Sequence, residues 1–166
     1  MAKKYTDKIL QQCFHPRIGK PGLRKIKPDV NRSKEHLQKA HNNLRAMRLM
    51  FREELFDWTV ICGYYAMYHS VLAALLYIGL EALAHHCAIA AFREFYVERG
   101  KVKPEYIQYI ERAKQLEKKY ADALEEARKD RVIVQYGVEI LTNDDADWIL
   151  EDAEDFISKI EETMQG

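Results

Sequence analysis

Apolar residues recur at three- and four-residue spacing in three stretches of the chain, a period typical of helices that bury one face. These stretches cover residues 33–52, 85–99 and 144–164. A weaker pattern with many charges begins at Pro104, a good first-turn residue, and continues to about Asp130. This weaker pattern predicts a helix that is half exposed.

Short polar residues mark where helices begin, because their side chains accept hydrogen bonds from free backbone amides. Asn31 or Ser33 is expected to cap the first helix, and Asn143 or Asp144 the last. Gly100 follows the second helix and is expected to end it, since glycine readily adopts the left-handed conformation found after helices.

The segment 58–80 contains no Lys, Arg, Asp or Glu over 23 residues, which is long enough to cross a bilayer at roughly 20 residues. Polar residues such as Thr59 and His69 interrupt it, and acidic rather than basic residues flank it. A helix that is apolar on all sides also suits the centre of a bundle. We therefore expect residues 55–79 to form a core helix without membrane contact.

Five helices joined by short loops predict an all-α fold, an up-and-down four/five-helix bundle over residues 31–166. Residues 1–30 are expected to form a basic, partly irregular N-terminal arm. Residues 8–14 could hold a short helix, whereas the stretch 15–22, which contains Pro and Gly, could not.

Charge is distributed unevenly, although the chain is neutral overall. Residues 1–52 hold 14 Lys and Arg against 3 Asp and Glu, and residues 53–166 hold 12 against 23. The basic part could bind an anionic partner, pair head to tail with a second copy, or fold back on the acidic part. The candidates for contact with nucleic acid or a partner are Lys20, Arg24, Lys25 and Lys27. A solvated arm is the alternative.

Cys13, Cys62 and Cys87 are odd in number and lack the CxxC spacing of a metal site. We expect three reduced thiols, no metal ion, no cofactor and a cytoplasmic location. The N-terminus is basic, but the apolar segment of a signal peptide does not follow it.

Four motifs occur in order along the chain. Residues 64–69 read Tyr-Tyr-Ala-Met-Tyr-His, and His86 opens the next helix, which is expected to end at Gly100. Residues 127–137 contain Ala-x-x-x-Arg followed by Gln-Tyr-Gly, and residues 145–156 form an acidic helix.

Together these motifs resemble the HEPN family over about residues 33–163, with Gln135 where the family usually has Asp. The resemblance implies a helical bundle that usually dimerises. It also implies one of two activities. The first is metal-independent cleavage of RNA by an Arg followed by a His after four to six residues. The second is association with a small nucleotidyltransferase or with nucleotides.

The usual ribonuclease motif is missing. None of the six histidines has an Arg five to seven residues before it, and Arg131 is followed five residues later by Tyr136. Tyrosine has a pKa near 10 and is a poor base at pH 7. Tyr136 could instead pack its ring in the turn, or be the target of nucleotidylation that the resemblance suggests.

The candidate ligand-binding residues are His69, His86, Arg128, Arg131 and Tyr136, with Arg131 and Tyr136 as weak catalytic candidates. His69 and His86 could line a groove for a nucleotide or phosphate, or could be satisfied core residues. The tyrosines of residues 64–77 could stack bases, or belong to the core and an interface.

We expect a homodimer that contacts its partner through residues 55–79 and 85–99. It would bind a nucleotide, RNA or a nucleotidyltransferase in a toxin–antitoxin or defence system. One alternative is a metal-independent endoribonuclease with a rearranged site built from Arg131 and a distant His. Another is a structural protein-interaction module. The missing motif favours a protein that is not an enzyme.

Overall fold

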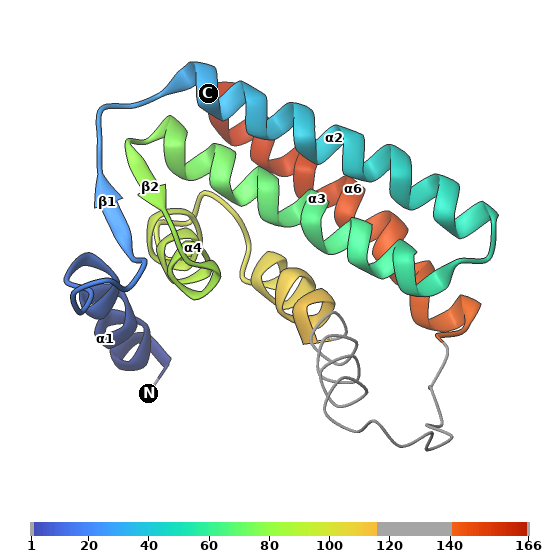
Figure 1. Cartoon of the computed structure of the whole chain (residues 1–166), viewed down its shortest axis with the longest axis horizontal. Helices are drawn as coiled ribbons and strands as arrows, with labels where there is room; N and C mark the ends of the chain where they lie inside the picture. Colours follow the sequence, from blue (N-terminus) through green and yellow to red (C-terminus); the bar gives the residue numbers. More distant parts are fainter. Residues whose placement is uncertain (1, 116–140, 166) are drawn as a thin grey trace.

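The computed structural model describes residues 2–115 and 141–165, and it confirms the all-α expectation. Its elements, drawn in Figure 1, are α1 (Ala2–Phe14), β1 (Leu23–Lys25), α2 (Val30–Arg52), α3 (Phe56–Tyr77), β2 (Leu80–Ala82), α4 (His85–Phe92), a π-helix (Arg93–Val97), a helix over residues 105–115 and α6 (Asn143–Gln165). The three long helices α2, α3 and α6 lie side by side, and α1 and α4 lie together beside one end of α3 (Figure 1).

The core is built around α3. This helix contacts both α2 and α6, and its fully buried residues include Val60, Tyr64, Met67 and Leu75. By length and composition α3 could cross a membrane, but 72% of its most apolar window is buried inside the protein. The helix thus packs most of its apolar surface against neighbouring elements, as expected at the centre of a bundle.

Helices α2, α3 and α6 approach one another closely at Gly63 of α3. A Cβ atom built on Gly63 would lie 2.6 Å from both Cγ1 and Cδ1 of Ile149 on α6, and 3.1 Å from Sδ of Met47 on α2. Ile149 and Met47 are fully buried, so neither can move aside without disturbing a close-packed interior. Only glycine leaves enough room for this three-helix contact.

The N-cap of α2 is Asp29, so the expectation of Asn31 or Ser33 is wrong. The Asp29 carboxylate accepts a hydrogen bond from the Arg32 N–H at 3.0 Å. Ser33 lies inside the first turn, where its buried hydroxyl donates to the Ala73 carbonyl of α3 at 2.8 Å. Ser33 therefore joins two helices and does not cap its own.

The expected cap of the last helix is also displaced. Ala146 N–H donates to the Thr142 carbonyl at 3.2 Å, which places Thr142 at the position before the first helical residue, Asn143. The expectation of Asn143 or Asp144 is thus off by one or two residues, because four polar residues in a row, 142–145, offer similar capping signals.

The helix expected over residues 85–99 is divided in two. α4 ends at Phe92, and a π-helical turn, Arg93–Val97, continues in the same segment. Gly100 then has a φ of 69°, the left-handed conformation expected for a helix stop signal. The helix expected from Pro104 to Asp130 is described over residues 105–115, and its remainder lies outside the described residues.

The basic N-terminal segment folds against the rest of the protein. β1 pairs antiparallel with β2, with Leu23 opposite Ala82. Just before β2, Gly79 has a φ of 81°, and a Cβ atom there would lie 2.6 Å from the Ile26 carbonyl oxygen. Arg24 of β1 and Arg32 of α2 also meet one carboxylate of β2. Arg24 and Arg32 lie 3.4 Å and 2.8 Å from the Glu81 oxygens.

A disulfide between Cys13 and Cys87 joins α1 to α4, with their Cα atoms 5.6 Å apart. Both cysteines are buried, and Cys62 carries the free thiol. The expectation of three reduced thiols is wrong for this pair. The two cysteines are 74 residues apart, so only the docking of α1 on α4 brings them together, and no local spacing indicates it.

Candidate functional site

His69 on α3 lies against His36 on α2. Their Nδ1 atoms are 3.0 Å apart and their ring centroids 5.2 Å apart. Both rings are half-buried. Because two neutral imidazoles can bond through Nδ1 only when one donates and the other accepts, the two rings hold opposite tautomers or share an added proton.

A contact between a histidine and a tyrosine extends this arrangement to α4. His85 Nδ1 is 2.9 Å from the Tyr64 hydroxyl, and the His85 ring lies 4.1 Å from the Tyr68 ring. Tyr68 is in turn 6.2 Å from the His69 ring. We call these five residues the polar aromatic cluster. Its members are His36, Tyr64, Tyr68, His69 and His85.

Burial sets the protonation state of this cluster. Burial first, and then nearby His36, Lys39 and His85, lower the pKa of His69 to about 4. The pKa of His36 is also lowered, by burial first and then by Lys39 and Arg32. Burial raises the pKa of Tyr68 to about 12. At neutral pH, therefore, His36, Tyr68 and His69 are uncharged hydrogen-bond donors and acceptors.

The Nε2 atoms of His36 and His69 lie on the outer sides of the pair, and the uptake of one proton changes which of them can donate a hydrogen bond. In the neutral pair, one Nε2 is a donor and the other an acceptor. If the pair takes up one proton, both Nε2 atoms become donors, and each can bond an acceptor on its own side of the pair. Lys39 is exposed one turn beyond His36 on α2, where it adds positive charge. The cluster therefore suits a ligand that carries phosphate.

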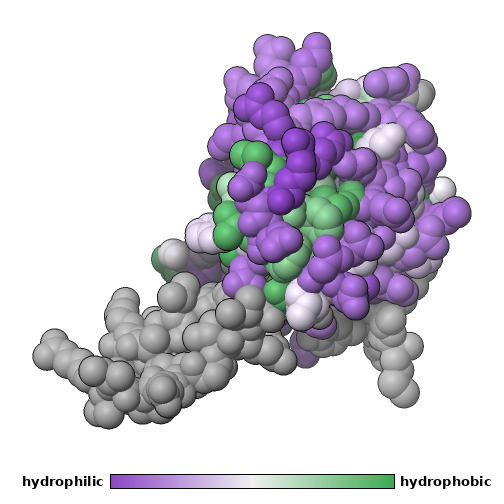
Figure 2. All heavy atoms as spheres, turned by 90° about the vertical axis from the view of Figure 1, so that its right-hand side faces the viewer, coloured by the Kyte–Doolittle hydropathy of each residue, from purple (hydrophilic) through white to green (hydrophobic). Residues whose placement is uncertain are grey.

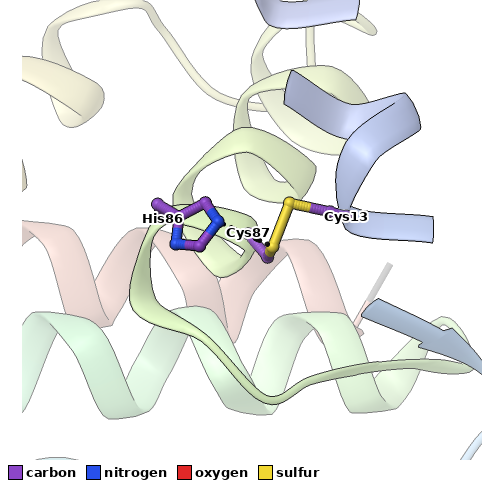
Figure 3. A group of neighbouring side chains, drawn as sticks. All are labelled: Cys13, His86 and Cys87. Carbon is purple, nitrogen blue, oxygen red and sulfur yellow. Dashed lines mark hydrogen bonds between the residues drawn. A yellow bond between two sulfur atoms is a disulfide. The ribbon is translucent and has the colours of Figure 1, made fainter. Parts of the chain in front are cut away.

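His86 lies apart from these contacts and faces α1. Its Nε2 is 3.3 Å from Cys87 Sγ, and Figure 3 shows the ring beside the disulfide. His86 also lines a cavity of about 550 Å³ together with His15 and Lys20. Adjacent residues on a helix point in different directions, and here His85 joins the cluster while its neighbour does not. Arg128, Arg131 and Tyr136 lie outside the described residues.

The four basic candidates for contact with nucleic acid or a partner differ in their surroundings. Arg24 is paired with Glu81, and Lys25 Nζ lies 5.5 Å from the Phe14 ring centroid. Lys20 and Lys27 are exposed. Two of the four thus contact the protein itself, and the other two present charge to solvent.

Sequence reasoning missed His36 and His85 as members of the cluster. A signal for His36 exists, because it lies on the same helical stripe as the buried residues Ser33, Ala40 and Met47. Two polar residues on an otherwise apolar stripe indicate a polar contact with a neighbouring helix. His85 follows a short strand, and no comparable period identifies it.

The lowered pKa of His69 makes stability depend on pH. An unfolded chain binds a proton at a histidine near pH 6.5, whereas the folded ring does so only near pH 4. We expect the free energy of unfolding to fall by roughly 1–2 kcal/mol between pH 7 and pH 4, after allowance for solvent screening of a half-buried ring. Above pH 7 this contribution is constant.

Urea unfolding at both pH values measures this effect, with His69→Gln beside the wild-type chain. The variant is expected to lose less stability on acidification. His41→Gln is the matched control, since His41 is an exposed histidine of α2 that bonds Glu161 at 2.7 Å and is not a member of the cluster. Equal losses in wild type and His69→Gln would contradict the assignment.

The fold and the cluster together define a class, an all-α bundle whose central apolar helix contributes a histidine to a polar aromatic site. The HEPN domain model matches residues 33–163, and the chain belongs to the HEPN family.

Two relatives are similar in sequence. A protein of Methanocaldococcus jannaschii named "Putative toxin MJ0605" is 26% identical over 126 residues, which cover 76% of this chain and 84% of the relative. A UPF0332 protein of Gloeobacter violaceus is 32% identical over 66 residues, which cover 40% of this chain and 52% of the relative. The family and the first relative support a toxin-like or HEPN-family role.

Proposed function

We propose that this chain is a toxin-type HEPN protein that binds single-stranded RNA at the polar aromatic cluster without cleaving it. The observation that carries the proposal is the hydrogen-bonded pair of His36 and His69, whose outer nitrogens can each bond a phosphate oxygen or a base. The relative named as a toxin supports the biological setting. RNA supplies both groups that the site can recognise, a phosphate and a planar base.

Aromatic side chains beside the histidine pair can contact the bases. Tyr65 is half-buried on α3, and His85 is exposed at the start of α4. The Tyr65 ring lies 5.2 Å from the Tyr64 ring, and the His85 ring lies 4.1 Å from the Tyr68 ring. Stacking on such rings holds bases with little dependence on sequence. Exposed Lys39 adds attraction to the phosphate backbone.

A homodimer is part of the proposal. Along α3, a stripe at three- and four-residue spacing is incompletely covered by the rest of the protein, and its members are Trp58, Cys62, Tyr65, His69 and Leu72. Trp58 has 57% of its surface exposed. A second copy packed on the Trp58 end of this stripe would bury its apolar side chains and leave His69 at the rim of the interface, where RNA can reach it.

Exposed apolar side chains at the turn between α2 and α3 extend this surface. Leu49 is 49% exposed and Leu55 is 47% exposed. Figure 2 views this end of the bundle and shows apolar groups among hydrophilic ones. A nucleotidyltransferase is the partner that we propose for surfaces left free by the dimer, to be tested by copurification of the two proteins.

Cleavage of RNA is the second candidate function, favoured by the convergence of His36, His69 and His85. A general base works best with a pKa near the operating pH. Burial holds the pKa of His69 near 4, so His69 is a weak base at neutral pH. The site therefore suits binding better than proton transfer.

The binding of a labelled single-stranded RNA, followed by fluorescence anisotropy in metal-free buffer, tests the proposal. His36→Gln and His69→Gln are each expected to weaken binding about tenfold, the loss of one charge-assisted hydrogen bond. His41→Gln should bind as the wild type does. Binding unaffected by either cluster variant would contradict the assignment of the site.

The same RNA, incubated with the wild-type chain and with Arg131→Ala, separates binding from cleavage. We expect intact RNA with both proteins. Cleavage by the wild type that is lost in Arg131→Ala would replace our proposal with the rearranged ribonuclease. Sedimentation at several concentrations measures the dimer independently of RNA.

A further inference from the structure

Three soft ligand atoms meet where α1 docks on α4. They are the Sγ atoms of Cys13 and Cys87 and a ring nitrogen of His86, and all lie within 4.8 Å of one another (Figure 3). The two cysteines are buried and His86 is exposed. In the structure the two sulfur atoms form a disulfide, which leaves no lone thiolate for a metal ion.

We propose that reduction of this disulfide creates a Zn²⁺ site made of the Cys13 and Cys87 thiolates and the His86 imidazole. Zn²⁺ binds thiolate at about 2.3 Å and imidazole at about 2.0 Å in a tetrahedron, so its ligand atoms lie roughly 3.3–3.8 Å apart. Cys87 Sγ and His86 Nε2 are already 3.3 Å apart. Small side-chain rotations would separate the two sulfurs to the required distance.

The surroundings of this proposed zinc site favour a soft metal ion. The adjoining cavity of about 550 Å³ is lined by Gln12, His15, Pro16, Arg17, Lys20, Pro21, His86 and Cys87. This lining holds no carboxylate, the ligand that Mg²⁺ and Ca²⁺ require. Arg17 and Lys20 instead favour the ionised form of a nearby thiol. A Zn²⁺ ion with two thiolates is neutral, so these cations do not oppose it.

The fourth position faces this cavity. His15 follows Cys13 by two residues and lines the same cavity as His86. It can supply the fourth ligand by a side-chain rotation, and a water molecule can take the position otherwise. Either arrangement gives the four-coordinate geometry that Zn²⁺ prefers.

The reaction balances with a dithiol as the reductant. Two electrons and two protons pass from the dithiol to the disulfide, which gives the Cys13 and Cys87 thiols and a disulfide of the reductant. Binding of one Zn²⁺ then releases two protons as the thiols become thiolates. The metal ion would hold α1 on α4 after the covalent bond has been broken.

Titration of the reduced full-length chain with Co²⁺ tests this site, because thiolate ligands give Co²⁺ an intense near-ultraviolet absorption. The chain is reduced with a phosphine and desalted without oxygen. We expect one Co²⁺ per chain, displaced by one Zn²⁺, and no binding by the oxidised chain. Cys13→Ser and Cys87→Ser should weaken binding at least about 100-fold, and His86→Gln at least about tenfold.

Two controls keep the test decisive. His86→Gln retains the disulfide and can be purified folded before reduction, so its result does not depend on the cysteine variants. Cys62→Ser removes the thiol that is not part of the proposed zinc site, and this variant should bind Co²⁺ as the wild type does. The proposal would be overturned if the fully reduced wild type bound no Co²⁺, or if His86→Gln bound as tightly as the wild type.

Discussion

Replacing Gly63 with leucine is expected to lower the free energy of unfolding by about 3 kcal/mol or more. Even a single Cβ atom at this position would lie 2.6 Å from two carbons of Ile149. Leucine adds three further carbons where α3 meets α2 and α6. Since Ile149 has no exposed surface, the helices themselves must separate, and contacts along their length are lost.

Chemical unfolding followed by circular dichroism measures this loss. Cys62→Leu is the matched control, because Cys62 is the adjacent residue of α3 and is only half-buried. It should change the free energy of unfolding by less than about 1 kcal/mol. If Gly63→Leu were as stable as this control, the close approach of the three helices would be wrong.

Replacing both Cys13 and Cys87 with serine is expected to lower the free energy of unfolding by about 4 kcal/mol relative to the oxidised chain. The disulfide spans 74 residues, and a covalent link of that length removes much conformational freedom from the unfolded chain. Guanidinium unfolding in the presence of a chelator measures the difference without interference from bound metal. Cys62→Ser, which leaves the disulfide intact, should unfold close to the wild type.

Reduction of the wild-type chain provides an independent check. The reduced chain without metal should unfold at about the same denaturant concentration as the double variant. Added Zn²⁺ should stabilise the reduced wild type alone, because ligands that bind only the folded state raise its stability. A double variant as stable as the oxidised wild type would contradict the disulfide.

The long helices could be predicted from the sequence because each has a strong pattern. The uncharged run 58–80 predicted the core helix, and α3, at Phe56–Tyr77, covers most of this run. The apolar stripe of residues 33–52 likewise predicted α2. Such patterns follow from burial of one face or of all faces, and they depend on nearby residues alone.

Features that depend on distant residues could not be predicted in the same way. The strands β1 and β2 are three residues long and pair with each other across more than 50 residues. The disulfide depends on where α1 docks. Asp29, Asn31 and Ser33 carry equal local signals for a helix cap, so the sequence could not identify Asp29. In the structure the Ser33 hydroxyl bonds Ala73 of α3, and this tertiary contact places Ser33 inside the helix.

The candidate site was found in part. His69 was identified from its place in the apolar segment, but its partner His36 lies 33 residues earlier on another helix. His86 was the sequence candidate, but the orientation of α4 places its neighbour His85 against Tyr64 in the cluster and His86 beside Cys87. Tertiary packing, rather than residue type, distinguishes them.

The position of α6 has a consequence for synthesis of the chain. α3 packs against α6, and α6 occupies Asn143–Gln165, close to the C-terminal end of the sequence. On the ribosome, therefore, the most apolar helix emerges long before the helix that covers one of its sides. During that interval the nascent chain exposes a surface that attracts chaperones or other unfinished chains, so folding of the whole bundle waits for its last segment.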